Sequence, residues 1–119
     1  MSDLLATASA WLDGRRRSHL SGMVTYRRGA LWAEVRATVG RTTFQTTDDY
    51  GAVQEWQSRD YLILAADLAD IGLPQAGDTI VEADGAAYEV LAPGGEPAWR
   101  WSDPYGRTLR IHTKQVSAA

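Results

Sequence analysis

Few side chains in this sequence have the types and spacing that catalysis or metal binding requires. His19 and His112 are the only histidines, and neither lies in a pattern typical of a metal site or a catalytic triad. We expect each to be a surface or strand-end histidine. Asp48 and Asp49 are adjacent acids in a short polar segment typical of a turn. Gly94-Gly95 lacks the strand-to-helix context and the lysine of a phosphate-binding loop. We therefore predict that the protein is not an enzyme and has no metal site and no cofactor.

Length and composition narrow the class of protein further. The chain has 119 residues, of which 45% are hydrophobic, and it has no cysteine, so disulfides and thiolate metal sites are excluded. This length predicts a single domain over residues 1–119. The start of the sequence does not resemble a secretory leader, and no apolar stretch approaches the length that spans a bilayer. We expect a soluble protein that is intracellular when it is made, without a membrane partner.

An amphipathic helix is predicted at the start of the chain, over residues 1–21. Ser2 is a suitable N-cap for it. The apolar side chains that follow share one helix face, because they are spaced by three or four residues. They are Leu4, Leu5, Ala8, Trp11 and Leu12. Three consecutive arginines, Arg15, Arg16 and Arg17, suit the C-terminal dipole of such a helix better than they indicate a nucleic-acid patch.

From Met23 onwards the hydrophobic period is two, as expected for strands with one buried face. The alternation predicts an antiparallel hairpin over residues 23–39. β-branched residues predict a strand over 42–47, either as a separate strand or as a continuation of the hairpin after a bulge at Gly40. A further strand is predicted over 53–64, followed by a helical turn or a loop.

The last third of the chain is predicted to form a hairpin, a long aromatic loop and a final strand. Asp84-Gly85 between two apolar runs is a strong hairpin signal. The loop over residues 93–106 contains two tryptophans, a tyrosine and three glycines, and such large aromatic side chains need to be buried against something. The predicted fold class is mainly β: a small antiparallel β-barrel or sandwich over residues 23–116, with one N-terminal α-helix and a long aromatic loop before the last strand.

Charge is unevenly distributed along the chain. Residues 1–41 carry seven arginines against three carboxylates, a net charge of +4, whereas residues 42–99 carry one arginine against eleven carboxylates, a net charge of −10. Residues 100–119 return to +3. The solvated faces of a soluble domain can segregate in this way, and so can surfaces that meet complementary surfaces on neighbouring subunits. The sequence allows both interpretations.

Nucleic-acid binding by this chain alone is weakly supported. Aromatic residues are interleaved with arginines at Tyr26-Arg27-Arg28 and at Trp99-Arg100-Trp101, which is the footprint expected of such a site. The acidic middle of the chain opposes it, because it would repel phosphate groups. We therefore expect no stable DNA complex.

Two blocks near the C-terminus resemble those of head-tail joining proteins of long-tailed bacteriophages and prophages, which are also called head-completion, stopper or tail-attachment proteins. The first is Pro74-x-x-Gly77-Asp78-x-Ile80 with Tyr88-x-Val90 after it, an element that many small β-barrels share. The second block is more specific and runs from Trp99-Arg100-Trp101-Ser102-Asp103-Pro104-Tyr105 to Leu109-Arg110-Ile111-His112. Together with the helix and the short strands, the resemblance covers most of the chain.

The resemblance implies a structural virion protein without enzymatic activity. It implies a ring of copies at the head-tail junction, which completes the DNA-filled head and docks the tail. The implied partners are other copies of the chain, a portal or adaptor protein, and a tail terminator or tail tube protein. The resemblance implies no binding partner role for DNA other than its passage through the channel of the ring.

The aromatic loop is the predicted partner interface, because exposed Trp, Tyr and Arg side chains often anchor interfaces. The predicted interface residues are Trp99, Arg100, Trp101, Tyr105, Arg15, Arg16 and Arg17. The alternative for Trp99 and Trp101 is that these residues, two apart on one face of a strand, complete the core.

The acidic residues Asp48, Asp49 and Glu55 are predicted to face the DNA channel, where like charge prevents DNA from sticking. A solvated loop is the alternative for this segment. A second function, from a different class, is a small β-barrel module that binds a peptide or small ligand without catalysis. Its groove would lie beside Trp32, Trp56 and Trp99.

Overall fold

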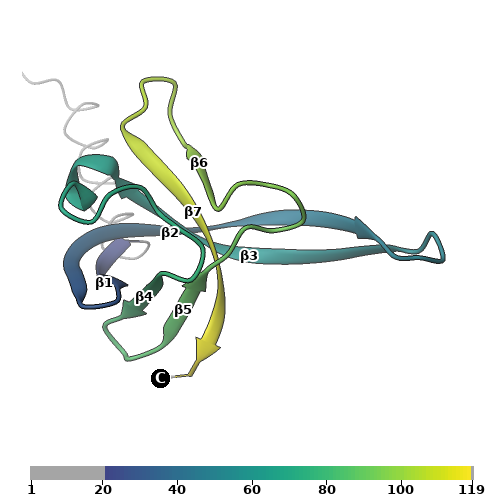
Figure 1. The fold of residues 1–119 in the computed structure, drawn as a ribbon, viewed down its shortest axis with the longest axis horizontal. Coiled ribbons are helices and arrows are strands. Elements are labelled where there is room, and N and C mark those ends of the chain that lie inside the picture. The colour runs from purple at the N-terminus through teal and green to yellow at the C-terminus, as the bar shows by residue number, and fades with distance from the viewer. Residues whose placement is uncertain (1–20, 119) are drawn as a thin grey trace, which may run out of the picture.

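The computed structural model describes residues 21–118, and β-strands make up most of that part of the chain (Figure 1). The strands form one seven-stranded antiparallel sheet, and the helical structure within residues 21–118 is a 3₁₀ turn, η1, at Ala65–Leu68. The prediction of a mainly β, antiparallel fold is confirmed. The predicted helix over residues 1–21 is not confirmed, because residues 1–20 lie outside the described part and Ser21 begins a strand.

Six of the seven strands pair with one another in a closed circuit. The strands are β1 Ser21–Arg28, β2 Leu31–Thr47, β3 Val53–Leu64, β4 Thr79–Glu82, β5 Ala87–Val90, β6 Trp99–Trp101 and β7 Thr108–Ser117. They pair in the order β3-β2-β1-β4-β5-β7-β6, and β3 also pairs with β7. The pairings of β1, β2, β3, β7, β5 and β4 therefore make a closed circuit, to which β6 is added at β7 (Figure 1).

Alternating side chains explain why β1 and β2 form a hairpin with one buried face. Tyr26 lies opposite Ala33, and the buried positions on both strands follow the period of two. The chain reverses at Gly29, whose φ of 59° is in the left-handed region that glycine adopts readily. The predicted hairpin over residues 23–39 is confirmed.

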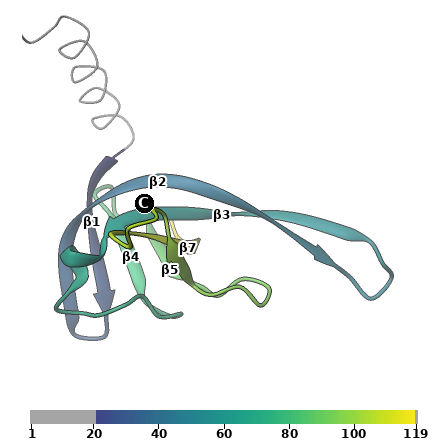
Figure 2. The same cartoon turned by 90° about the horizontal axis from the view of Figure 1, so that it is seen from above.

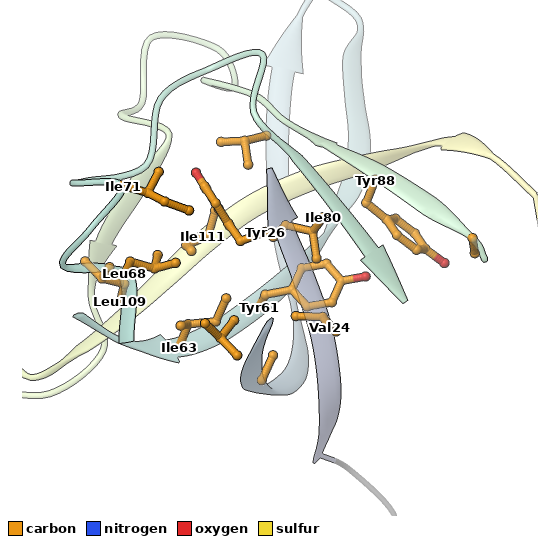
Figure 3. Packing of buried hydrophobic residues seen from close by; sticks show 14 residues of the cluster. Val24, Tyr26, Tyr61, Ile63, Leu68, Ile71, Ile80, Tyr88, Leu109 and Ile111 are labelled. Carbon is orange, nitrogen blue, oxygen red and sulfur yellow. The ribbon is translucent and has the colours of Figure 1, made fainter. Parts of the chain in front are cut away.

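The hydrophobic core lies between the strands of the closed circuit (Figure 3). Tyr26 and Tyr61 are its largest fully buried side chains, and Leu68 and Ile71 enter it from η1 and the loop that follows. The buried hydrophobic residues are Val24, Tyr26, Val35, Ala37, Tyr61, Ile63, Leu68, Ile71, Ile80, Ala86, Tyr88, Val90, Leu109 and Ile111. Burial of this apolar surface is the main favourable contribution to folding.

A buried ion pair fastens the loop after η1 to β1. Asp78 accepts hydrogen bonds from Arg28 Nε at 3.0 Å, from Arg28 Nη2 at 2.8 Å and from the Tyr26 hydroxyl. The same guanidinium donates to the carbonyl oxygens of Ile71 at 2.8 Å and Leu73 at 2.6 Å. Burial would raise the pKa of Asp78, but the hydrogen bonds from Arg28 and Tyr26 lower it below its ordinary value. The aspartate of the Gly-Asp-x-Ile motif therefore has a structural role.

A second polar cluster lies at the other end of β4. Arg59 Nε donates to the Tyr61 hydroxyl at 3.0 Å, and the Tyr61 hydroxyl donates to Glu82 Oε1 at 2.7 Å. The Arg59 guanidinium also pairs with Glu82 and lies over the ring of Tyr88, 4.8 Å from its centroid. Burial raises the pKa of the Tyr61 phenol, and its hydrogen bond to Glu82 raises it further. One polar cluster therefore lies at each end of β4, beside the hydrophobic core.

β2 and β3 continue beyond the closed circuit as a two-stranded hairpin, residues 42–58, which we call the arm (Figure 1, Figure 2). β1 pairs with β2 only as far as Thr38, and β7 pairs with β3 only from Arg59 onwards. The paired part of the arm is about 20 Å long at ~3.3 Å per residue. Gly40 pairs with Asp60 in regular register, so β2 is one continuous strand and the predicted bulge is absent from it.

The aromatic loop predicted over residues 93–106 is partly a strand. The preceding hairpin is confirmed, with Gly85 N–H donating to the carbonyl oxygen of Glu82 at 2.9 Å. β5 then ends at Val90 and leaves the next part of one edge of β7 unpaired. β6 occupies that edge, because its backbone groups find hydrogen-bonding partners there.

Candidate partner-binding surfaces

The aromatic residues predicted as partner anchors lie on the hairpin of β6 and β7, residues 99–110, which we call the aromatic hairpin. Trp99 lies opposite Ile111 and packs against the core, whereas Trp101, opposite Leu109, is 44% exposed. The two indole rings meet edge to face with their centroids 5.1 Å apart. Trp99 therefore contributes to the core, and Trp101 is available to a partner.

The turn of the aromatic hairpin presents Tyr105 to solvent. Asp103 Oδ1 accepts hydrogen bonds from the backbone N–H groups of Thr108 at 2.8 Å and Arg107 at 2.9 Å. These hydrogen bonds lower the pKa of Asp103. Tyr105 is 80% exposed, and the Arg107 guanidinium lies 5.8 Å from its ring centroid. A turn held in this way loses little conformational freedom when a partner binds.

Arg100 lies on the opposite face of β6 from the two tryptophans. It is exposed and pairs in register with Arg110. Arg110 is bound to Asp60, whereas Arg100 forms no ion pair within residues 21–118. Arg100 is therefore available to an acidic group of a partner.

The acidic residues predicted to face a channel lie toward the tip of the arm. Asp48 holds the turn, because its Oδ1 accepts hydrogen bonds from the N–H groups of Tyr50 at 2.9 Å and Ala52 at 2.8 Å. Asp49 and Glu55 are exposed, and neither forms an ion pair with another described residue. The structure therefore places Asp48 and Asp49 in the turn at the tip of the arm and Glu55 opposite Gln45 in its paired part, and it gives Asp48 a local structural role.

An aromatic stack lies on one face of the arm. Phe44 and Trp56 are opposite each other in the β2–β3 register, and their rings stack with centroids 4.9 Å apart. Phe44 also meets the ring of His112 edge to face at 5.2 Å. This contact joins the arm to β7.

A buried hydrogen-bond network, which we call the polar joint, lies where the arm leaves the body. Asp60 is fully buried, and its carboxylate accepts hydrogen bonds from Arg110 Nη1 at 2.7 Å, from Ser58 Oγ at 2.5 Å and from the Thr42 hydroxyl. His112 Nδ1 lies 2.9 Å from its Oδ1. Burial would raise the pKa of Asp60, but hydrogen bonds from His112 and the other partners lower it well below its usual range.

The prediction of a surface or strand-end position for His112 is wrong, because its side chain is buried in the polar joint. At His112, β3 lies along one edge of β7, and the segment between β5 and β6 lies along the other edge. The backbone N–H of His112 donates to the carbonyl oxygen of Ala98 at 2.9 Å, and its carbonyl oxygen accepts from the N–H of Leu91 at 3.0 Å. Sequence spacing shows none of these long-range contacts, so the sequence analysis also missed the role of Asp60.

A further exposed surface is the outer side of β1 and β2, which we call the β1–β2 outer face. Its outward side chains are Met23, Thr25, Arg27, Trp32, Glu34 and Arg36. Trp32 is 66% exposed opposite Arg27, and Met23 is 46% exposed opposite Arg36. The sequence analysis did not place these residues in the interface. The sequence pattern that could have identified them is the alternation along β2, because burial of Val35 places Trp32 and Arg36 on the outward face of the strand.

The three tryptophans beside which the alternative ligand groove was predicted have different neighbours in the described part of the chain. Trp56 stacks on Phe44, Trp99 contacts Trp101, and Trp32 lies on the β1–β2 outer face. The three tryptophans of that prediction therefore lie in separate environments. The predicted interface residues Arg15, Arg16 and Arg17, and also His19, lie outside the described residues.

Neither a metal cluster nor a membrane span occurs in residues 21–118. No group of three or more His, Cys, Asp or Glu side chains there is arranged to hold a metal ion. No helix in the same residues has the length and hydrophobicity needed to cross a bilayer.

A β-rich body that carries exposed aromatic and cationic side chains on projecting hairpins is typical of a protein that binds other proteins in an assembly. A family model described as phage head-tail joining protein matches residues 2–119. The chain therefore belongs to the phage head-tail joining protein family, whose members are structural connectors of the virion that interact with other head and tail proteins. Comparison with curated protein sequences yields no match.

Proposed function

We propose that copies of this protein form a ring that completes the DNA-filled head and docks the tail. The observation that carries the proposal is the exposure of Trp101, Tyr105 and Arg100 on a hairpin whose turn is held by hydrogen bonds to Asp103 and whose two strands pair in register. Tryptophan, tyrosine and arginine are the residues that most often dominate the binding energy of an interface. Membership of the head-tail joining family supports a protein partner for this surface.

The closed strand circuit suits a ring subunit. We propose that it acts as one small barrel-like domain, stiff enough to transmit force between head and tail. A subunit of a closed ring needs two different surfaces for its neighbours and further surfaces for the components above and below. In this proposal a portal or adaptor protein lies on the head side, and a tail terminator or tail tube protein lies on the tail side.

DNA takes part in this proposal only by passing through the ring. The channel-facing position expected for Asp48, Asp49 and Glu55 stays a prediction. The absence of catalysis also stays a prediction.

Trp101→Ala is expected to leave the protein folded while preventing the assembly of infectious particles. Its free energy of unfolding should fall by about 1 kcal/mol, the value of an aromatic pair, because Trp101 is half exposed and contacts Trp99. The partner should lose an anchor of the docking surface. Denaturant unfolding measures the first effect. The titre of infectious particles, together with electron microscopy of unjoined heads and tails, measures the second.

Two matched variants control this experiment. Trp99→Ala removes a ring that packs against the core and should destabilise the fold by about 3 kcal/mol. Tyr105→Ala removes an exposed ring and should change the stability by less than about 0.5 kcal/mol while still impairing assembly. Normal particle assembly by both Trp101→Ala and Tyr105→Ala would show that the aromatic hairpin is not a docking surface.

A further inference from the structure

β1 and the part of β2 that pairs with it lie toward one end of the long axis of the molecule, and the arm extends to the other end (Figure 1, Figure 2). A head-to-tail contact between identical subunits requires two different surfaces at separate places on the subunit. Such a contact closes into a ring when the rotation from one copy to the next is suitable. The chemistry of the two surfaces decides whether they fit each other.

The arm is an acidic element with exposed apolar residues near its tip. Residues 42–58 include Asp48, Asp49 and Glu55 and contain no lysine or arginine. Tyr50 is 96% exposed and Val53 is 65% exposed. The arm therefore offers both negative charge and apolar surface to whatever it contacts.

The β1–β2 outer face has complementary chemistry. Arg27 and Arg36 are exposed on it and form no ion pair within residues 21–118, whereas Arg28 points to the other side of β1 and binds Asp78. Trp32 and Met23 lie opposite these two exposed arginines in the strand register. Two exposed cations beside two large apolar side chains match the acids, the tyrosine and the valine of the arm.

We propose that the arm of one copy docks across the β1–β2 outer face of the next copy. This inference rests on the proposed function, because it specifies the contact between neighbours in the ring. The arm is long enough, at about 20 Å, to cross two adjacent strands that lie ~4.8 Å apart and to extend along them. The face and the arm are both strand structures with a regular register, so neither surface has to fold in order to bind.

The arm carries features that a DNA channel does not need. Negative charge alone keeps DNA from sticking to a channel wall. Tyr50 and Val53 add nothing to that repulsion, and exposed apolar side chains of this size are typical of protein contacts. The inference therefore places the acidic tip between copies, as an alternative to the channel-facing position that the sequence analysis expected for it.

A cross-linking experiment in assembled particles tests the contact directly. A photoreactive phenylalanine analogue replaces Tyr50 in the full chain, particles are assembled and irradiated, and the products are mapped by mass spectrometry. The expected product joins two copies of the chain, between position 50 of one copy and residues 22–38 of the other. A product within a single chain, with another virion protein, with DNA or with any other part of a second copy would overturn the proposal. So would the absence of a product.

Charge reversal gives an independent test with its own rescue. Asp49→Arg with Glu55→Arg in one chain, or Arg27→Glu with Arg36→Glu in another, should each lower the titre of infectious particles by about 100-fold, because like charges then meet at every contact. A one-to-one mixture of the two variants should restore the titre to within about tenfold, since alternating copies regain opposite charges at every contact. Failure of the mixture to recover, while each variant stays folded, would overturn the proposal.

A matched control separates this contact from general charge effects. Asp67→Arg with Asp70→Arg changes the net charge by the same amount and in the same direction as Asp49→Arg with Glu55→Arg, but on exposed residues outside both surfaces, and it should leave the titre unchanged. Failure of the arm-to-face contact and failure of the proposed connector function would give different results. A cross-link from position 50 to another head or tail protein would overturn the arm-to-face contact but leave the connector function standing. Particles that join heads to tails without this chain would remove the connector function itself.

Discussion

Asp60→Ala is expected to lower the free energy of unfolding by about 3–5 kcal/mol. The substitution removes the carboxylate that Arg110, Ser58, Thr42 and His112 share in the polar joint. Arg110 would remain partly buried without its counter-ion, and the loss of a partner for a buried charge is among the largest single effects on stability. Unfolding in urea, followed by tryptophan fluorescence, measures the change.

Asp67→Ala is the matched control for this variant. Asp67 lies in η1 and is exposed, so its removal should change the stability by less than about 0.5 kcal/mol. A loss below about 1 kcal/mol for Asp60→Ala would show that the polar joint contributes little, because a single ordinary hydrogen bond is worth that much.

The stability difference between wild type and Asp60→Ala should depend on pH. The pKa of Asp60 is lower in the folded protein than its ordinary value of about 3.9, which applies to the unfolded chain. A group with a lowered folded pKa stabilises the protein above its unfolded pKa and loses that effect as the pH falls toward its folded pKa. The difference should therefore be constant near neutral pH and should narrow below about pH 4. A difference that widens in acid would contradict the assignment.

Arg28→Met is expected to destabilise the protein by about 3 kcal/mol. Methionine preserves the apolar stem of the side chain but removes the guanidinium that binds Asp78 and the carbonyl oxygens of Ile71 and Leu73. Asp78 is 4% exposed, so its charge would lose its main compensation. Thermal and urea unfolding measure the loss, and limited proteolysis should show earlier cleavage in residues 71–78.

Arg27→Met provides a matched control on the same strand. Arg27 is exposed on the opposite face of β1 and makes no ion pair within residues 21–118, so its replacement should change the stability by less than about 0.5 kcal/mol. Equal losses of stability in Arg28→Met and Arg27→Met would show that the ion pair of Arg28 with Asp78 does not stabilise the fold. A large effect of Arg28→Met without earlier proteolysis would show that the loop after η1 is held by its apolar contacts instead.

Asp60→Ala and Arg28→Met each remove a contact between distant segments of the protein. The polar joint connects the arm to β3 and β7, and the clamp of Arg28 and Asp78 connects the loop after η1 to β1. Each joins segments that lie far apart in the chain, with about 50 residues between the partners. A connector that must not deform gains from such long-range ties, because local hairpins alone would allow its projections to swing.

Local patterns were sufficient to predict much of the fold. The period of two after Met23 predicted the hairpin of β1 and β2, and the segment over residues 53–64, which ends in the apolar run 61–64, predicted β3 with its observed bounds. Asp84-Gly85 predicted the turn between β4 and β5. Hydrophobic alternation and turn preferences depend on residues that are close in sequence, so they can be recognised in the sequence alone. The motif blocks were also sufficient for the family, since residues 2–119 match its model.

Which side chains of these strands are buried and which are exposed depended on the closure of the strand circuit. Trp99 and Trp101 are identical in type and lie two residues apart, yet one packs against the core and the other is half exposed, because the edge of β7 positions them differently. His112 became buried only because β3, β6 and the segment after β5 meet at one point of β7. Sequence alone therefore determined the turns, the family and every strand except β6, which needed the free edge of β7. The long-range register determined which aromatic, acidic and basic side chains remain exposed for partners, since burial depends on neighbours that lie far away in the chain.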